Sequence, residues 1–302
     1  MRLKLNESKL GYYPELLNYL SSLQLDKIDY KHPNDTLKQS FTEIIVLYSK
    51  MLPILNKHEI VDFDSELKRE KDIKELLRLT KQLYQEADIY IENMKKMINS
   101  IKLKEDAVMK DVQKELADKI KPYEKNIISI PNNAIKHDGN IIKSIEMIKD
   151  ESTRIIGYYL EASREETYGP NPNVHKDYKG EATAFSYNKS LKMILGSIYS
   201  ISNECLVILK KYVNDTICEN KDLTLDFNTK AIINTLIEIP LAFFPDELNK
   251  RFVNIYFEGD VSIIEYPSSL FPLRGSKYEI QSSVRISKTS TKFTLPYFRE
   301  RK

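Results

Sequence analysis

Residues 73–101, IKELLRLTKQLYQEADIYIENMKKMINSI, decide the fold class of this chain of 302 residues. Apolar or neutral side chains recur every three or four positions from Ile73 to Ile101, and Glu and Lys fill the positions between them. This period places one apolar stripe along one face of an α-helix. The periodic segment runs from Asp64 to Ile101, and at about 1.5 Å per residue it predicts a helix about 45–55 Å long.

The stripe fits two arrangements. It is compatible with a coiled-coil arm that dimerises, and also with the long spine of a helical bundle within one chain. We favour the bundle, because other helical patterns nearby can cover the stripe. These patterns cover residues 14–25, residues 34–53 up to Pro53, residues 108–120 before Pro122, residues 141–148, residues 188–212 and residues 228–239. Around Lys102–Asp106, either the long helix bends or a second helix folds back.

Two stretches favour extended structure instead. Arg154–Ala162 and Ala182–Tyr187 flank a segment rich in turn residues, which predicts a β-hairpin with a long tip inserted between two helices, near residues 154–187. After Phe252, β-branched and aromatic residues alternate between turn residues, which predicts a small sheet. The predicted class is therefore mainly α, and α+β overall: an elongated helical bundle with an inserted β-hairpin and a small C-terminal β-rich region. We expect a bundle over 1–220 and a mixed helix and strand region over 221–302.

Composition excludes several classes of protein. The 46 basic and 44 acidic residues give a net charge of +2, which is too small for a surface that attracts nucleic acid or membrane everywhere. Cys205 and Cys218 are thirteen positions apart with no histidine close in sequence, so no zinc site is predicted. The phosphate-loop motif is absent, and we expect no cofactor. Because no signal peptide or membrane span is evident, we expect a cytoplasmic protein without a membrane partner.

One polar segment, NNAIKHDGN at residues 132–140, carries the residue types of a reactive site. A histidine such as His137 exchanges protons near neutral pH, and a lysine such as Lys136 binds phosphate or stabilises developing charge. Asparagine amides orient an imidazole or bind ribose and phosphate. Together these are the parts for cleaving RNA by activating a 2′-hydroxyl. The alternative is a capped helix start whose histidine bonds a carbonyl or faces solvent. The predicted catalytic residues are His137, Lys136 and Asn133, and the predicted substrate-binding residues are Asn132, Asp138 and His175.

His175 lies in the turn-rich tip, in GPNPNVHKD. If the hairpin folds back over the start of the 141–150 helix, His175 and His137 face one cleft. If it does not, His175 belongs to an exposed loop. His32 and His58 are expected to be solvated or to form local hydrogen bonds.

The motif resembles the signature of the HEPN superfamily, in which an Arg, a polar residue and a His four positions beyond it form a ribonuclease site at a dimer interface. Asn133 matches the polar residue, His137 matches the histidine, and Asn132 stands where the arginine should be. The resemblance covers residues 36–215 as a bundle. It implies a metal-independent ribonuclease or RNA-binding protein, an RNA ligand, a homodimer, and a role in prokaryotic or phage conflict such as defence or toxin–antitoxin systems. Lys136 could substitute for the missing cation, although a lysine lacks the planar fork of an arginine.

The alternative function is that of a non-catalytic interaction or scaffold subunit. In that case the long helix over residues 73–101 and the C-terminal strands would bind a partner protein.

Overall fold

The computed structural model describes residues 2–5, 12–21, 32–59, 66–148, 154–164, 167–176, 182–213, 227–247, 252–258, 261–267 and 283–286. The helices are α1 (Tyr12–Ser21), α2 (Pro33–Glu59), α3 (Glu66–Ile98), α4 (Met109–Glu124), the π-helix η1 (Lys125–Ser129), α5 (Ile130–Lys136), α6 (Tyr187–Tyr212) and α7 (Phe227–Glu238). The strands are β1 (Arg2–Leu5), β2 (Ile141–Ile148), β3 (Arg154–Arg164), β4 (Thr167–Pro170), β5 (Phe185–Ser186), β6 (Asn254–Glu258), β7 (Val261–Glu265) and β8 (Ser283–Ile286).

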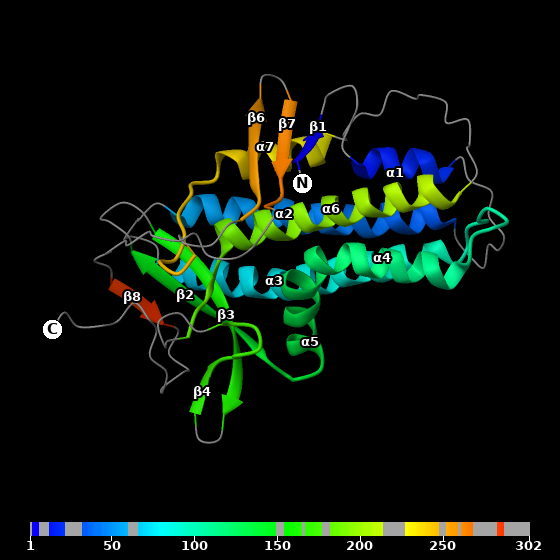
Figure 1. The fold of residues 1–302 in the computed structure, drawn as a ribbon. Coiled ribbons are helices and arrows are strands. Elements are labelled where there is room, and N and C mark those ends of the chain that lie inside the picture. Colours follow the sequence, from blue (N-terminus) through cyan, green and yellow to red (C-terminus); the bar gives the residue numbers. More distant parts are fainter. Residues whose placement is uncertain are drawn as a thin grey trace.

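A bundle of long helices forms the body of the molecule, with one sheet at its end and another along its side (Figure 1). The predicted fold class is confirmed. Helix α3 is the spine: its stripe residues Leu76, Leu83 and Met94 are completely or almost completely buried, and α2 packs along it. The apolar face of α3 is thus covered by its own chain, as the bundle interpretation expects.

Helix α4 folds back after α3 instead of prolonging it. Val112, Leu116 and Ile120 are buried along the contact with α6, and the Lys104 N–H donates to the Tyr212 carbonyl at 3.0 Å. Of the two alternatives near Lys102–Asp106, the structure therefore has the second helix.

Proline does not end α2. The prediction that this helix stops near Pro53 was wrong, since α2 continues to Glu59. Pro53 is exposed, while Leu52 and Leu55 are buried on the opposite side. Burial of this stripe offsets the hydrogen bond and steric cost of about 3 kcal/mol that an internal proline carries.

The segment 141–148 is strand β2, so the predicted helix there was wrong. β2 pairs antiparallel with β3 from Ile141↔Glu161 to Ile148↔Arg154. Both of its faces are covered: Ile142 joins the main core, whereas Ile145 and Met147 join a smaller cluster on the other side. Isoleucines at 141, 142, 145 and 148 match a helical period, but β-branched residues buried on both faces suit a strand equally well.

Of the predicted extended stretches, Arg154–Ala162 lies within β3, whereas in Ala182–Tyr187 only Phe185 and Ser186 form a strand, β5, and Tyr187 begins α6. β3 pairs with β5 at Gly157↔Ser186 and Tyr158↔Phe185, but its main partner is β2 and not the returning arm of the predicted hairpin. A Cβ on Gly157 would lie 2.4 Å from the Phe185 carbonyl oxygen and from the Phe244 ring, so the approach of β5 requires glycine at this position.

A second sheet has the order β1-β7-β6 and joins the N-terminal strand to the hairpin over residues 254–265. β1 pairs antiparallel with β7, from Arg2↔Glu265 to Leu5↔Ser262. Of the small sheet predicted after Phe252, the strands β6, β7 and β8 are present, while residues 287–302 lie outside the described residues, as does the predicted domain boundary near residue 220. That boundary stays a prediction.

Helix α6 runs through the centre of the bundle. It is the one described helix that is long and apolar enough to cross a membrane by length and composition, which the sequence analysis did not expect. In the fold, however, 83% of the apolar window is buried inside the molecule. The core helix of a globular protein has the same character.

Candidate functional site

The polar motif lies at the end of a helix and not at the start of one. The chain passes from α4 through η1 into α5, with Pro131 in the first turn of α5. The His137 N–H donates to the Asn133 carbonyl at 2.8 Å and closes the helix, and Gly139 then reverses the chain with φ +64°. This left-handed residue just after the last turn is a common helix ending.

Four of the six predicted site residues lie together on the surface at this helix end. The side chains of Asn133, Lys136, His137 and Asp138 are all exposed. Within the part of the chain that the structure describes, the His137 imidazole forms no hydrogen bond. His137 is therefore exposed and is not bound to a carbonyl of any described residue.

Asn132 points the other way. It is 1% exposed, and its Nδ2 donates to the Asp88 carboxylate of α3 at 2.8 Å. Burial raises the pKa of Asp88 and repulsion from Glu92 adds to this, while Lys136 and Asn132 lower it. The residue in the place of the HEPN arginine thus holds α5 against α3 instead of reaching a ligand at the surface.

His175 is buried within the sheet region. Its Nε2 accepts the Leu160 N–H at 2.8 Å, and its ring packs against Phe185 at a centroid distance of 4.5 Å. The loop does cover the start of the 141–148 segment, because the Asn171 amide donates to the Asn140 amide oxygen at 2.8 Å. At 1% exposure, however, His175 cannot share an open cleft with the exposed His137.

A surface groove of about 370 Å³ runs beside the motif. Its α3 wall consists of Leu77, Arg78 and Lys81, and its other wall consists of Ile135 and residues 139–142. Arg78 is held in place by Glu75, with contacts of 2.7 and 2.5 Å, whereas Lys81 is exposed. We use the name α5 surface for Asn133, Lys136, His137, Arg78 and Lys81 together. Arg78 and Lys81 were not among the predicted site residues, since charges along a helix usually form a solvated face.

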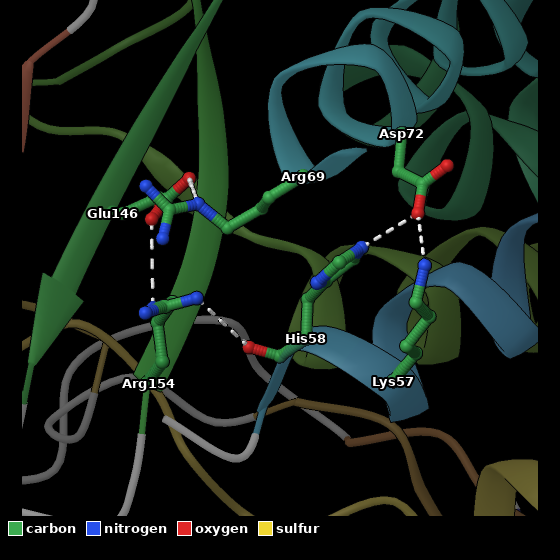
Figure 2. A network of polar contacts seen from close by, with 6 residues as sticks. All are labelled: Lys57, His58, Arg69, Asp72, Glu146 and Arg154. Carbon is green, nitrogen blue, oxygen red and sulfur yellow. Dashed lines mark hydrogen bonds and ion pairs between the residues drawn. The ribbon is translucent and has the colours of Figure 1, made fainter. Parts of the chain in front are cut away.

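A separate polar network joins the end of the bundle to the sheet (Figure 2). Glu146 of β2 lies between two guanidinium groups, with Arg69 Nε at 3.8 Å and Arg154 Nε at 3.5 Å. Arg154 also donates to the His58 carbonyl at 3.5 Å, and the His58 ring contacts Asp72 at 2.8 Å. His58 was expected to be solvated or to bond locally; instead it is buried, and its ring bonds a residue of the next helix, Asp72 of α3.

No family model matches the sequence, and no curated protein or solved structure is significantly similar to it. The HEPN resemblance therefore rests on the motif residues themselves. Within the described ranges, no three His, Cys, Asp or Glu side chains gather as metal ligands.

Proposed function

We propose that this protein binds RNA at the α5 surface. The observation that carries the proposal is the joint exposure of Asn133, Lys136 and His137 at the end of α5. Next to them lies the groove that Arg78 and Lys81 line from α3 and that Ile135 and residues 139–142 line from the motif side. Lysine and arginine neutralise phosphates, and an amide or imidazole bonds ribose hydroxyls and phosphate oxygens. Because the net charge of the chain is only +2, RNA binding depends on this local group of cations.

The HEPN resemblance supports a further step, cleavage of the bound strand without a metal. In this step the His137 imidazole removes the 2′-hydroxyl proton, and the 2′-oxygen attacks the adjacent phosphorus. The bond to the 5′-oxygen breaks, and that oxygen takes up a proton from imidazolium or water. The products are a 2′,3′-cyclic phosphate and a 5′-hydroxyl. Lys136 stabilises the charge on the phosphoryl oxygens, because Asn132 is turned toward Asp88.

Binding is tested by fluorescence anisotropy with a labelled single-stranded RNA of about twenty nucleotides. The double variant Lys81→Ala/Lys136→Ala is expected to raise Kd about tenfold or more, and to lower the slope of log K against log salt by about 1.4 to 2. The matched control is Lys110→Ala/Lys121→Ala on α4, which removes two exposed lysines and the same net charge. The control should change Kd less than about twofold. Equal losses in both variants, or no binding by the wild type, would show that the α5 surface is not an RNA site.

Cleavage is tested on the same RNA in the presence of EDTA. The wild type is expected to yield cyclic-phosphate ends, and His137→Ala is expected to lose them without a change in Tm, because the exposed imidazole has no partner to lose among the described residues. If His137→Ala still cleaves the RNA, His137 is not the catalytic base. If the protein neither binds nor cleaves RNA, the remaining alternative is a non-catalytic subunit that binds a partner protein.

A further inference from the structure

One cation of the α5 surface differs from the others in how its charged group is held. Arg78 donates from Nε to Glu75 Oε2 at 2.7 Å and from Nη2 to Glu75 Oε1 at 2.5 Å. Its third nitrogen, Nη1, donates to Gln82 Oε1 at 3.0 Å. All three nitrogen atoms of the guanidinium group are thus engaged, and yet the side chain is 54% exposed.

This arrangement leaves the flat faces of Arg78 as the part that can meet a ligand. A guanidinium group binds phosphate through the five N–H groups in its plane, and three of these are already used. The Glu75 carboxylate also offsets the charge. The faces of Arg78 have no ring contact among the residues that the structure describes. An exposed guanidinium plane that is fixed in this way is a platform on which a nucleobase stacks.

The groove that Arg78 lines also has apolar walls. They come from Leu77 of α3, Ile135 of α5, and Ile141 and Ile142 at the start of β2. Ile141 is 58% exposed. Phosphate gains nothing from such a surface, whereas the face of a base is apolar enough to cover it. The groove volume of about 370 Å³ exceeds the roughly 150 Å³ in which one benzene ring fits.

The two lysines of the α5 surface border this groove. Lys81 lines it from α3, and Lys136 directly follows Ile135 at the end of α5. Both side chains are exposed. The phosphates on either side of a base that is bound in the groove therefore have cations to meet.

We propose that the groove takes one unstacked base of a single-stranded RNA, which stacks on the face of Arg78 while Lys81 and Lys136 bind the flanking phosphates. The inference rests on the proposed function, because it names the form of RNA that the α5 surface accepts. A base inside a duplex is already stacked on its neighbours and cannot enter the groove, so the site selects single strands.

The first test compares a labelled single-stranded RNA of about twenty nucleotides with the duplex of the same sequence, by fluorescence anisotropy at one salt concentration. A duplex has the denser phosphate charge, so attraction between charges alone favours the duplex. The wild type is instead expected to bind the single strand about tenfold more tightly or better, since stacking adds to its affinity. Equal or tighter binding of the duplex overturns the inference.

The second test exchanges the two kinds of cation without changing the charge. Arg78→Lys keeps the charge and removes the plane, so Kd for the single strand is expected to rise about fivefold or more with an unchanged salt slope. Lys81→Arg is the matched control and should change Kd less than about twofold, because a phosphate contact needs only the charge. Circular dichroism checks that both variants are folded, and the comparison of single strand with duplex on the wild type decides should either fail to fold.

The outcomes separate this inference from the proposed function. If Lys81→Ala/Lys136→Ala weakens RNA binding but Arg78→Lys binds the single strand like the wild type, the α5 surface binds RNA through charge alone and the inference is wrong. If the wild type binds neither the single strand nor the duplex, both proposals are wrong.

Discussion

The carboxyl group of Glu247 is buried, and its pKa lies well above that of an ordinary glutamate. Burial raises its pKa to about 7; the nearby Lys189 ammonium lowers it, and repulsion from Asp246 raises it further. Because the group accepts two backbone N–H bonds, its protonation couples the turn at 246–247 to the start of α6.

This shift predicts how stability depends on pH. An unfolded glutamate titrates near about 4.3, so between roughly pH 4.5 and 7 the folded protein keeps a proton that the unfolded chain has released. The free energy of unfolding should therefore fall as pH rises through this window, by on the order of 1–3 kcal/mol, and should level off above pH 7. Urea unfolding at pH 5, 6, 7 and 8 measures it.

The reference for this measurement is Glu247→Gln, which cannot titrate. The difference in the free energy of unfolding between the wild type and Glu247→Gln should change with pH. Glu105 is an exposed glutamate after α3, so Glu105→Gln should have the same pH profile as the wild type. A wild-type profile parallel to that of Glu247→Gln would contradict the prediction.

The histidines show how far single residues can be interpreted from sequence. His137 was identified by its polar neighbours, and the structure leaves it exposed at the end of α5. His175 has similar neighbours, yet it is buried and accepts a hydrogen bond from the backbone of β3. Local composition was the same kind of signal in both cases, and only the fold of the 171–176 loop onto β3 separates them.

At the scale of elements, β2 is the segment where a helical period and a strand compete. In a helix, Ile141 would lie on the apolar face with Ile142 and Ile145, and Met147 would lie off it. In the strand, Met147 is fully buried and Ile141 is 58% exposed. Pairing with β3 along the whole of β2 decides between them.

This difference predicts unequal losses of stability for two similar truncations. Met147→Ala is expected to lower the free energy of unfolding by about 2–4 kcal/mol, because it empties a buried site in the smaller cluster that also contains Ile145 and Ile155. Ile141→Ala should cost less than about 1 kcal/mol. Urea denaturation of both variants tests this, and a larger loss for Ile141→Ala would favour the helix over the strand.

At the scale of the whole molecule, the network in Figure 2 joins the bundle to the sheet. Arg69 comes from α3, Glu146 from β2 and Arg154 from β3, and the Arg154 side chain is 4% exposed. Removing a buried charge from such a group leaves the others without compensation, which costs far more than losing a surface ion pair.

We therefore expect Glu146→Gln to lower the free energy of unfolding by about 2–4 kcal/mol. The comparison is Glu70→Gln, whose carboxylate pairs with Lys74 at the surface, with side chains 64% and 72% exposed. That change should cost no more than about 0.5 kcal/mol. Chemical denaturation measures both, and similar small losses would mean that the network does not hold the sheet to the bundle.

The sequence by itself determined the helices whose apolar residues repeat every three or four positions over many turns, α3 and α6 above all. A long amphipathic period has one low-energy solution, a helix buried along one face, and so the helical bundle followed from residues 73–101. The polar motif was also visible, because its residue types are unusual next to one another.

Only the tertiary structure decided which of these features face solvent and which are buried. The partner of Asn132 is Asp88, that of His175 is Leu160, and that of Glu247 is Ser186, each far away in the chain. Short segments such as 141–148 gain too little from their own backbone to choose a conformation, so strand pairing and burial choose it for them. The outward orientation of the α5 surface arises in the same way, from contacts that no local pattern encodes.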